Sequence, residues 1–403
     1  MTETKPGPLD GIKILDLSTV LLGPYAGQIM GDLGADVIRV ESPQSDITRW
    51  SGDASQPGFG FLFMNANRNK RSLCLNLKKD GAKEILTRMI KEADVFLHNI
   101  RLDAIERLGF GYEDVKAIKE DIVYVHAVGY GSDGPYAGQP AYDDLIQAAG
   151  GGATLGQYID GDEDPKLIPT LIADKTSGLH CAYALLAALF HRERTGQGQY
   201  VEVPMLESFV SFLMMDHMGN RIYEPERGIV GYHKVSNPNR RPYKTSDGYI
   251  YIMPMGPDVW AKLFTLGDSD IAPDDPMFTD MDLMLANLPQ IYEAMHAMTK
   301  QKTTQEWYDL LSANDIPVMY VNDIDGLMDD PHLKAVNMFE SRSHHRETGY
   351  ISTKHPIKFS ETPASVRRDP PGLGEHNREI LLEYGYSDEE VDALEEGRVL
   401  RSL

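Results

Sequence analysis

The first part of the chain alternates between short apolar runs and amphipathic segments. Apolar runs of strand length occur at Ile12–Leu17, Asp36–Glu41, Ser72–Leu77, Asp94–Leu97 and Ile122–Val128. Helical spacing of apolar residues is expected between them, over Tyr25–Leu33, Asp80–Ala93 and Tyr112–Lys119. Strands that alternate with helices form parallel sheets, because a helix returns the chain to the edge where the next strand starts. The pattern therefore predicts an α/β fold with a doubly wound, Rossmann-like sheet.

The regular alternation ends after Met205. Residues 223–241 carry Pro, Gly and Asn without periodicity, and helical patterns then alternate irregularly with short apolar runs. We expect a smaller α+β domain over residues 225–330. Residues 1–224 would form the first part of the large α/β domain, and residues 331–403 would return to complete it.

A long helical pattern separates these two parts and begins beside an isolated carboxylate. Leu179, Ala182, Leu185 and Leu189 recur at helical spacing after Asp174, and the pattern ends in the basic run 191–194 before Gly196. Asp174 has two interpretations: it caps the helix, which is worth about 1 kcal/mol, or it is a catalytic nucleophile. The helix dipole and nearby backbone N–H groups are expected to keep the carboxylate ionised.

Composition limits the class of protein. The 403 residues include 42% hydrophobic and 25% charged residues, as in ordinary globular proteins. Acidic residues outnumber basic ones by 61 to 39, which gives a net charge of −22 and makes nucleic acid binding over a general positive surface improbable. No apolar run has the length of a membrane span, and the start of the chain lacks the features of a signal peptide. We therefore expect a cytoplasmic enzyme.

Cysteine and glycine patterns exclude two further kinds of site. Two cysteines, Cys74 and Cys181, are too few for a disulfide framework, and no Cys/His cluster has zinc spacing, so no structural metal is expected. Glu41 ends the second strand where a ribose-binding acid would lie in a dinucleotide fold. However, the glycines between residues 23 and 34 do not match the G-x-G-x-x-G pattern, so they are better explained by close packing of helix on sheet.

Several separate stretches, in order, carry a resemblance to a known family. They are LDGIKILDLS at 9–18, GADVIRVESP at 34–43, NKRSLCLNLK at 69–78, ADVFLHN at 93–99, ERLGFGYEDVKAI at 106–118, GYGSDGPYAGQPAYDDLIQAAGG at 129–151 and RTGQGQYVEVPMLES at 194–208, together with the Asp174 segment. On these motifs the chain resembles the family III CoA-transferases (CaiB/BaiF family), the group that includes formyl-CoA:oxalate and crotonobetainyl-CoA:carnitine CoA-transferases. The resemblance spans nearly the whole chain.

The resemblance implies that Asp174 is the nucleophile. Its carboxylate would attack a thioester carbonyl and expel CoA thiolate, leaving a mixed anhydride. The thiolate would then attack the aspartyl carbonyl and release the donor acid, leaving an aspartyl-CoA thioester that the acceptor acid resolves. Backbone N–H groups of glycine-rich turns are the usual oxyanion donors for such steps.

The resemblance also implies how CoA is bound, with no tightly bound cofactor besides CoA or acyl-CoA as substrate. Residues carried over to CoA binding are Leu75, Lys78, Asn99, Arg107 and Tyr142, and the nearby Arg39, Lys70 and Arg71 are expected to meet phosphate oxygens. A solvated strand end is the structural alternative for Lys78, and a surface ion pair is the alternative for Arg107. The group would lie along successive strand ends of the sheet, which makes the large domain the CoA-binding one.

Three departures from the family pattern bear on the acid that is transferred. Leu21 replaces a glutamine, Ser42 replaces an arginine, and VSNPNRRPYKTSDG at 235–248 replaces a glycine-run loop. These changes argue against oxalate and formate. Leu21 and the methionines at 214, 215, 218, 253 and 255 would suit a larger or less polar acid, although methionines are more often core filling.

Two alternatives to a transferase stay open from the sequence. The related α-methylacyl-CoA racemases place a histidine near position 142, where this chain has Tyr142, whose side-chain pKa of about 10 suits it poorly to abstracting an α-proton. A non-catalytic CoA-binding protein is the other alternative, and the intact Asp174 segment argues against it. The resemblance further implies an interlocked homodimer that binds an acyl-CoA and a small carboxylic acid.

Overall fold

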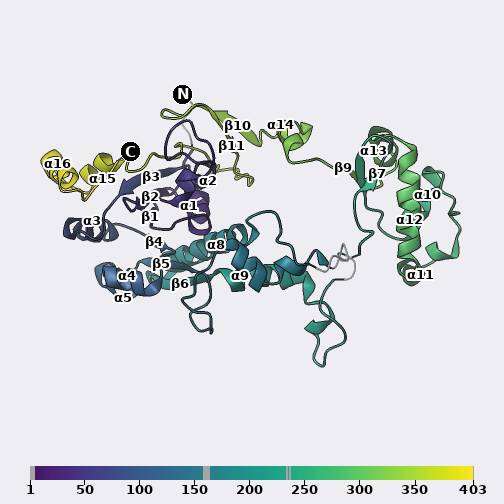
Figure 1. Cartoon of the computed structure of the whole chain (residues 1–403), viewed down its shortest axis with the longest axis horizontal. Coiled ribbons are helices and arrows are strands. Elements are labelled where there is room, and N and C mark those ends of the chain that lie inside the picture. The colour runs from purple at the N-terminus through teal and green to yellow at the C-terminus, as the bar shows by residue number, and fades with distance from the viewer. Residues whose placement is uncertain (1–4, 158–163, 233–234, 236, 403) are drawn as a thin grey trace. The chain divides into compact units, whose positions relative to one another are not determined.

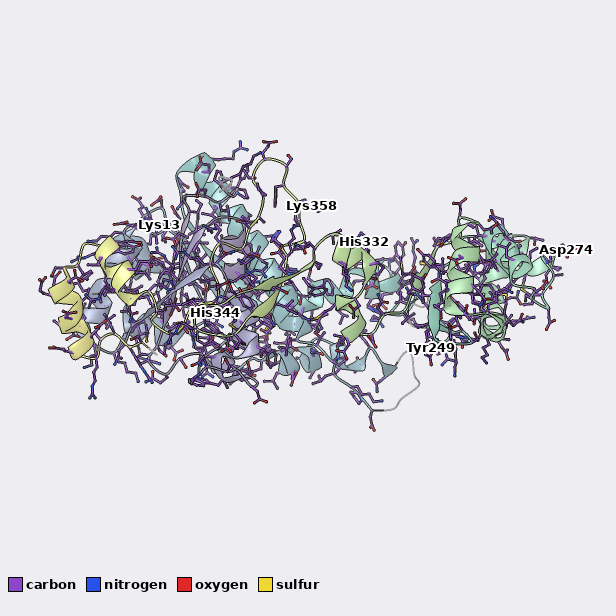
Figure 2. All side chains as sticks on the ribbon, turned by 90° about the horizontal axis from the view of Figure 1, so that it is seen from above. Lys13, Tyr249, Asp274, His332, His344 and Lys358 are labelled. Carbon is purple, nitrogen blue, oxygen red and sulfur yellow. The ribbon has the colours of Figure 1, made fainter. Side chains whose placement is uncertain are left out.

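The computed structural model describes residues 5–157, 164–232, 235 and 237–402. Met1–Thr4 at the start of the chain, and Ser236 within the 235–248 segment, lie outside the described residues. The chain divides into two compact units: residues 1–153, 167–215 and 335–403 form the first, and residues 154–166 and 216–334 form the second. Lys13 and His344 lie in the first unit, and Tyr249 and Asp274 lie in the second (Figure 2).

A parallel sheet of six strands, counted over the described residues, forms the centre of the first unit (Figure 1). The strands are β1 (Lys13–Asp16), β2 (Asp36–Glu41), β3 (Lys70–Cys74), β4 (Val95–His98), β5 (Val123–Val128) and β6 (Gln199–Pro204). Their spatial order is β3-β2-β1-β4-β5-β6, and every adjacent pair is parallel. This is the doubly wound Rossmann order, in which the chain changes direction across the sheet between β1 and β4. The predicted fold class is confirmed.

Helices connect these strands much as the periodicity predicts. They are α1 (Leu22–Asp32), α2 (Phe61–Ala66), α3 (Asp80–Ile90), α4 (Leu102–Leu108), α5 (Tyr112–Ile118), α6 (Asp143–Ala149), α8 (Ile172–Thr195) and α9 (Met205–His217). The sequence analysis did not predict α2, α4 or the strand β6. Both helices are a few residues long, and most residues of β6 are only half-buried, so each gives a weak periodic signal.

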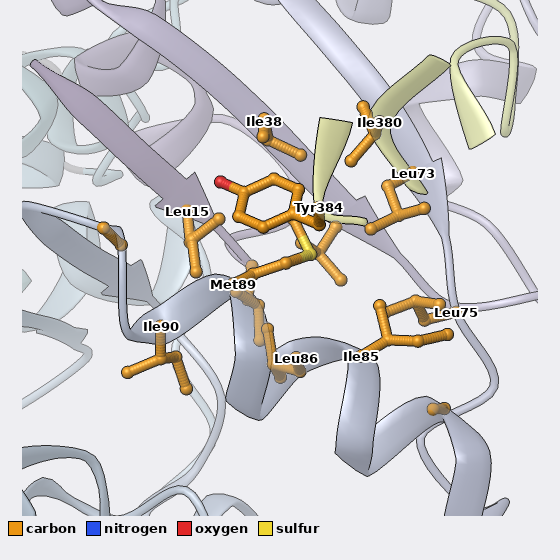
Figure 3. Packing of buried hydrophobic residues seen from close by; sticks show 14 of the residues in the cluster. Leu15, Ile38, Leu73, Leu75, Ile85, Leu86, Met89, Ile90, Ile380 and Tyr384 are labelled. Carbon is orange, nitrogen blue, oxygen red and sulfur yellow. The ribbon is translucent and has the colours of Figure 1, made fainter. Parts of the chain in front are cut away.

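The C-terminal segment completes one face of the sheet. It contributes β10 (Phe339–Arg342), β11 (Tyr350–Thr353), α15 (Asn377–Glu383) and α16 (Asp388–Glu396). Ile380 and Tyr384 belong to the same buried cluster as Ile38 and Leu73 of the sheet and Met89 of α3 (Figure 3). Because this cluster draws residues from both ends of the chain, the first unit cannot form its full core without residues 335–403.

Buried ion pairs link β1 to β3, and β2 to the segment that follows it. Arg49 pairs with Glu41 at 2.6 Å, and Lys70 pairs with Asp16 at 2.9 Å. All four residues are at most 6% exposed. Burial lowers the pKa of Lys70 to about 8, although Asp16 opposes that shift. Breaking such a buried pair strands an uncompensated charge, so these residues fix how the strands and loops meet.

The second unit has its own core. Its elements are β7 (Tyr243–Lys244), β8 (Tyr249–Ile252), α10 (Pro257–Leu266), α11 (Met281–Ala286), α12 (Leu288–Met298), α13 (Thr304–Ser312), β9 (Val318–Tyr320) and α14 (Pro331–Ala335), the last of which ends in the first unit. The strands form an antiparallel sheet in the order β7-β8-β9. Trp260, Phe264, Ile291 and Trp307 are among the residues buried between the sheet and the helices.

Within the described part of the chain, none of the helices combines the length and the apolar character needed to cross a membrane.

Candidate active site

A pocket of about 510 Å³ opens in the first unit at the carboxyl ends of the parallel strands. Its walls come from the loops after β1, β4 and β5, from β6 and from the start of α8. The loops after β1 and β4 meet here directly, because the backbone N–H of Thr19 donates to Asn99 Oδ1 at 2.9 Å. In doubly wound sheets ligands bind at this point of reversal, where adjacent loops diverge and leave a crevice.

Asp174 lines this pocket from the first turn of α8. The helix begins at Ile172 with Leu171 at the N-cap, so Asp174 is inside the helix and the capping interpretation is wrong. Gly178, one turn further on, lets α8 approach α1 closely. A Cβ atom at Gly178 would lie 2.9 Å from the Tyr25 ring and 3.0 Å from the Leu22 carbonyl oxygen. This contact brings Asp174 against the first residues of α1.

A second carboxylate, Asp143 of α6, lies beside Asp174. Asp143 Oδ1 accepts the backbone N–H of Asp174 at 2.9 Å, and Oδ2 accepts Gln147 Nε2 at 2.6 Å. Asp143 thus satisfies a free N–H group at the start of α8 from a distant part of the chain. Asp143 is 4% exposed and Asp174 is 8% exposed, so the two carboxylates share an environment with little water.

This environment makes Asp174 a weaker acid than the sequence analysis expected. Burial and the neighbouring Asp143 raise the pKa of Asp174 to about 7, against the lowering effect of a hydrogen bond from the Leu22 backbone N–H. The expectation that the helix start keeps Asp174 fully ionised is therefore wrong. Desolvation and a like charge outweigh the helix terminus. Near neutral pH the carboxyl divides between its protonated form and a desolvated, basic carboxylate.

The loop that carries Leu22 is held in a strained conformation. Val20 has φ = +68°, which is rare for a β-branched residue. Its backbone N–H donates to Asp46 Oδ2 at 2.9 Å, and Asp46 in turn is fixed by Arg39 at 2.5 Å. Asn99 Nδ2 donates to the Thr19 carbonyl oxygen at 2.9 Å. Side chains from two other loops thus impose the conformation that directs Leu22 toward Asp174.

A row of titratable side chains forms another wall of the pocket. His126 Nε2 donates to the Ile100 carbonyl oxygen at 2.9 Å, and its Nδ1 lies 3.1 Å from the Tyr200 hydroxyl. That hydroxyl donates to Glu202 Oε2 at 3.2 Å. Burial lowers the pKa of His126, so the imidazole is neutral near pH 7. These side chains give the wall polar groups without a positive charge.

The structure brings three of the predicted site residues together and leaves two others at the surface. Asn99, Tyr142 and Asp174 line the pocket. Lys78 and Arg107 are exposed and lie outside the pocket lining. Arg107 pairs with Asp103 at 3.1 Å on the surface of α4, which was its structural alternative.

The predicted phosphate contacts Arg39, Lys70 and Arg71, and the predicted CoA contact Leu75, are buried instead. Arg39 and Lys70 are 0% exposed and are held by carboxylates within the sheet, and Arg71 is 5% exposed and pairs with Asp36, Glu379 and Glu383. Leu75 is 1% exposed and packs in the core. The prediction that these side chains contact CoA directly is therefore at odds with their burial in the structure. Arg39 instead positions Asp46, since a buried guanidinium needs carboxylate partners.

In the ranges that the structure describes, no group of three or more His, Cys, Asp or Glu side chains is arranged to hold a metal ion.

Comparison with known proteins now identifies the family. The model of CoA-transferase family III matches residues 9–377. The chain belongs to CoA-transferase family III. It is 30% identical to a formyl-CoA:oxalate CoA-transferase of Streptomyces avermitilis, over 97% of this chain and 99% of that one. It is also 30% identical to a succinyl-CoA:glutarate CoA-transferase of Mus musculus, over 95% of this chain and 87% of that one.

Solved structures agree with this assignment. A CaiB/BaiF family protein from Brucella suis is similar with a TM-score of 0.80 and 30% identity, over 94% of this chain and 100% of that one. The chain is therefore an enzyme of the CoA-transferase type, and CoA thioesters are the substrates of this family. A non-catalytic CoA-binding protein is not what these relatives support.

Three residues at or near the pocket of this family III enzyme were not predicted from the sequence as site residues. Arg101 lines the pocket with an exposed side chain, and Asp143 and Asp46 hold Asp174 and Val20 in place. Arg101 lies two residues after the predicted Asn99, and Asp143 directly follows the predicted Tyr142, so proximity to a motif was the available signal. Asp46 lies in a loop without periodicity, and only its contacts reveal its part.

The strain at Val20 has a measurable consequence. Val20→Gly is expected to raise the free energy of unfolding of this CoA-transferase by up to about 1 kcal/mol, because glycine adopts positive φ without steric cost. Thr19→Gly, at a neighbouring position with ordinary φ, should lower it, since glycine adds disorder to the unfolded chain. Urea unfolding of both variants measures the difference. Equal destabilisation by the two substitutions would contradict the strain.

The raised pKa of Asp174 also affects stability. A carboxyl whose folded pKa of about 7 exceeds its unfolded value binds protons better when folded, so it destabilises the fold increasingly as pH rises toward 7. Asp174→Asn is therefore expected to stabilise the enzyme by about 1–3 kcal/mol at pH 8. The gain should disappear as pH falls to about 4.

Urea unfolding between pH 4 and 8 tests this dependence. Asp144→Asn is the matched control for the loss of a carboxylate, because Asp144 is the exposed neighbour of Asp143 on α6. A stability difference for Asp174→Asn that stays constant across this range would count against the raised pKa.

Proposed function

We propose that this enzyme is an acyl-CoA:carboxylate CoA-transferase that uses Asp174 as its covalent nucleophile. The observation that carries the proposal is a buried carboxylate with a pKa of about 7 in the pocket at the reversal point of the sheet. A carboxylate stripped of water is more reactive toward a thioester carbonyl than a solvated one, because the solvent no longer stabilises its charge.

The reaction then proceeds through two covalent states of Asp174. One carboxylate oxygen bonds to the acyl carbonyl carbon, the C–S bond breaks, and CoA leaves as a thiolate. The thiolate attacks the aspartyl carbonyl carbon of the resulting anhydride. The bond between that carbon and the bridging oxygen breaks, and the donor acid leaves with that oxygen. The acceptor carboxylate repeats the same two steps in reverse and departs as the new acyl-CoA.

Asp143 and the Leu22 N–H group have opposite effects on this chemistry. The charge of Asp143 disfavours the ionised nucleophile, whereas the Leu22 N–H group favours it. When Asp174 becomes an anhydride or a thioester it loses its negative charge, and the repulsion from Asp143 is relieved. Asp143 thus favours the acylated states relative to the free carboxylate.

CoA binding is assigned to the pocket lining. Asn99 and Arg101 follow β4, and Tyr142 precedes α6 on the other side of the opening. Arg101 is the arginine of the lining, and its exposed guanidinium can pair with a phosphate of CoA without paying for burial. Lys78 and Arg107 are exposed and stay candidates for phosphate contacts outside the pocket.

The remaining parts of the proposal rest on the family. No tightly bound cofactor is invoked, and the enzyme is proposed to act in the cytoplasm as an interlocked homodimer. The acceptor is proposed to be an acid larger or less polar than oxalate or formate, because Leu21 and Ser42 replace polar and charged family residues. Two relatives act, by name, on oxalate and on glutarate, so the family accommodates different acids.

Loss of the nucleophile tests the mechanism. Asp174→Asn is expected to lower CoA exchange between succinyl-CoA and a panel of acids by more than about a thousandfold, because an amide does not form the anhydride. Hydroxylamine added with an acyl-CoA should modify Asp174 in the wild-type enzyme, as seen by peptide mass. For the wild type, kcat/KM should rise with pH and level off above about pH 7 as Asp174 ionises. Full exchange activity in the Asp174→Asn variant would refute the assignment.

The racemase alternative is separated in the same assay. A racemase exchanges the α-proton of a 2-methylacyl-CoA with deuterium from the solvent and needs no acceptor acid. Deuterium incorporation without an acceptor, at a rate equal to CoA exchange, would favour the racemase.

Substitution of two arginines tests the proposed contact between Arg101 and a phosphate of CoA. Arg101→Gln is expected to raise KM for acyl-CoA by about tenfold with little change in kcat, since a charge-assisted hydrogen bond contributes about 1.5–3 kcal/mol before solvent screening. The increase should shrink in high salt. Arg107→Gln should change KM less, because Arg107 lies outside the pocket and pairs with Asp103.

Lys91→Gln, at an exposed residue after α3, is the control for general charge loss. A larger increase in KM for Arg107→Gln than for Arg101→Gln would favour Arg107, the residue predicted from the sequence motif, as the phosphate contact.

A further inference from the structure

A second cavity, of about 720 Å³, lies within the second unit. Its walls are formed by the end of β8 with the loop that follows it, by α10, and by α11 with the start of α12. The volume falls in the range of about 300–1,000 Å³ that is typical of small-molecule sites. The Asp174 chemistry does not use this cavity, although Asn237, Arg240 and Tyr243 of its lining belong to the 235–248 segment that replaces the glycine-run loop of the family.

The walls of the cavity are apolar and incompletely covered. Met253 is 38% exposed, Met255 is 59%, Met281 is 48% and Leu285 is 50%. Trp260 lies at the base and is only 4% exposed. Flexible methionine side chains adapt to ligands of different shape, and an apolar guest would remove these side chains from water. The cavity therefore favours a ligand with a sizeable apolar part.

The described lining residues carry positive charge only. Arg240 is the one cation among them, and no carboxylate is present in the lining. Burial raises the pKa values of Tyr243 and Tyr292, so both phenols stay neutral near pH 7. Arg240 is near enough to Tyr292 to oppose that shift.

Arg240 is also available to a ligand. Its side chain is half-buried, and it has no ion pair or side-chain hydrogen bond among the described residues. In a chain of net charge −22, a half-buried arginine that faces an apolar cavity without a carboxylate partner is unusual. An anionic group on the ligand would complete its pairing.

We propose that this cavity binds an amphipathic monocarboxylate, such as a medium-chain fatty acid. Arg240 holds the carboxylate, and the methionine, leucine and aromatic walls take the apolar chain. A short acid such as acetate offers the charge alone, and an alcohol of the same chain length offers the chain alone, so neither fills both parts of the site. The methionines at 253 and 255 thereby gain a binding role in place of core filling.

Fluorescence of Trp260 tests the proposal. Titration of the full-length enzyme with decanoate, below its micelle concentration, is expected to change tryptophan emission in a saturable way. Arg240→Met should weaken binding by about tenfold or more, the scale of a charge-assisted hydrogen bond. Arg241→Met should change it by less than about twofold, since Arg241 is exposed and does not line the cavity. Decanol and acetate should each bind the wild type at least about tenfold more weakly than decanoate.

Three further measurements make the result decisive. Trp260→Phe should abolish the signal, because Trp50 is in the first unit and Trp307 is buried in the core of the second. Asp174→Asn should bind decanoate as the wild type does, so that failure of the transferase mechanism leaves this proposal intact. Light scattering with and without decanoate reports whether the ligand changes the oligomeric state of the enzyme.

The proposal is overturned if decanoate gives no saturable change, or if the signal survives Trp260→Phe. It is also overturned if the two arginine variants weaken binding equally. A change of scattering mass on addition of decanoate that accounts for the emission change would assign the signal to association of chains instead.

Discussion

The active site depends on a loop that cannot hold its conformation by itself. Val20 has positive φ, and it is kept there because Asp46 accepts its N–H group while Asn99 fixes Thr19 on the other side. Asp46 is itself fixed by the buried Arg39. The strain is thus supported by an ion pair between β2 and the loop that follows it, and by the neighbouring strand end, and it directs the Leu22 N–H group to Asp174.

The same construction explains why Asp174, the proposed nucleophile, is buried and has a raised pKa. Gly178 allows α8 to approach α1, which removes water from Asp174, and Asp143 adds a like charge beside it. Each effect destabilises the ionised carboxyl, and each would be relieved by the proposed acylation of Asp174. The fold therefore stores unfavourable free energy at the proposed nucleophile, as is common where activity and stability compete.

The cavities of the two units differ in chemical character. The first unit presents polar groups and a carboxylate at the end of a parallel sheet, which suits a phosphate-bearing thioester. The second unit presents an apolar cavity whose described lining residues include one arginine, which suits the proposed medium-chain monocarboxylate. The net charge of −22 leaves each proposed anionic ligand to local arginines.

The sequence by itself determined the alternation of strands and helices and the family, because periodicity and ordered motifs are local properties of the chain. It also singled out Asp174 as the candidate nucleophile. It misplaced Arg39, Lys70 and Arg71, since adjacency to a motif does not reveal whether a cation faces solvent or a buried carboxylate. It also predicted an ionised Asp174 from the helix start alone. Only the tertiary structure brought Asp143 and Leu22 to that carboxyl, and a pKa depends on every charge and on the solvent within a few ångströms, wherever along the chain they originate.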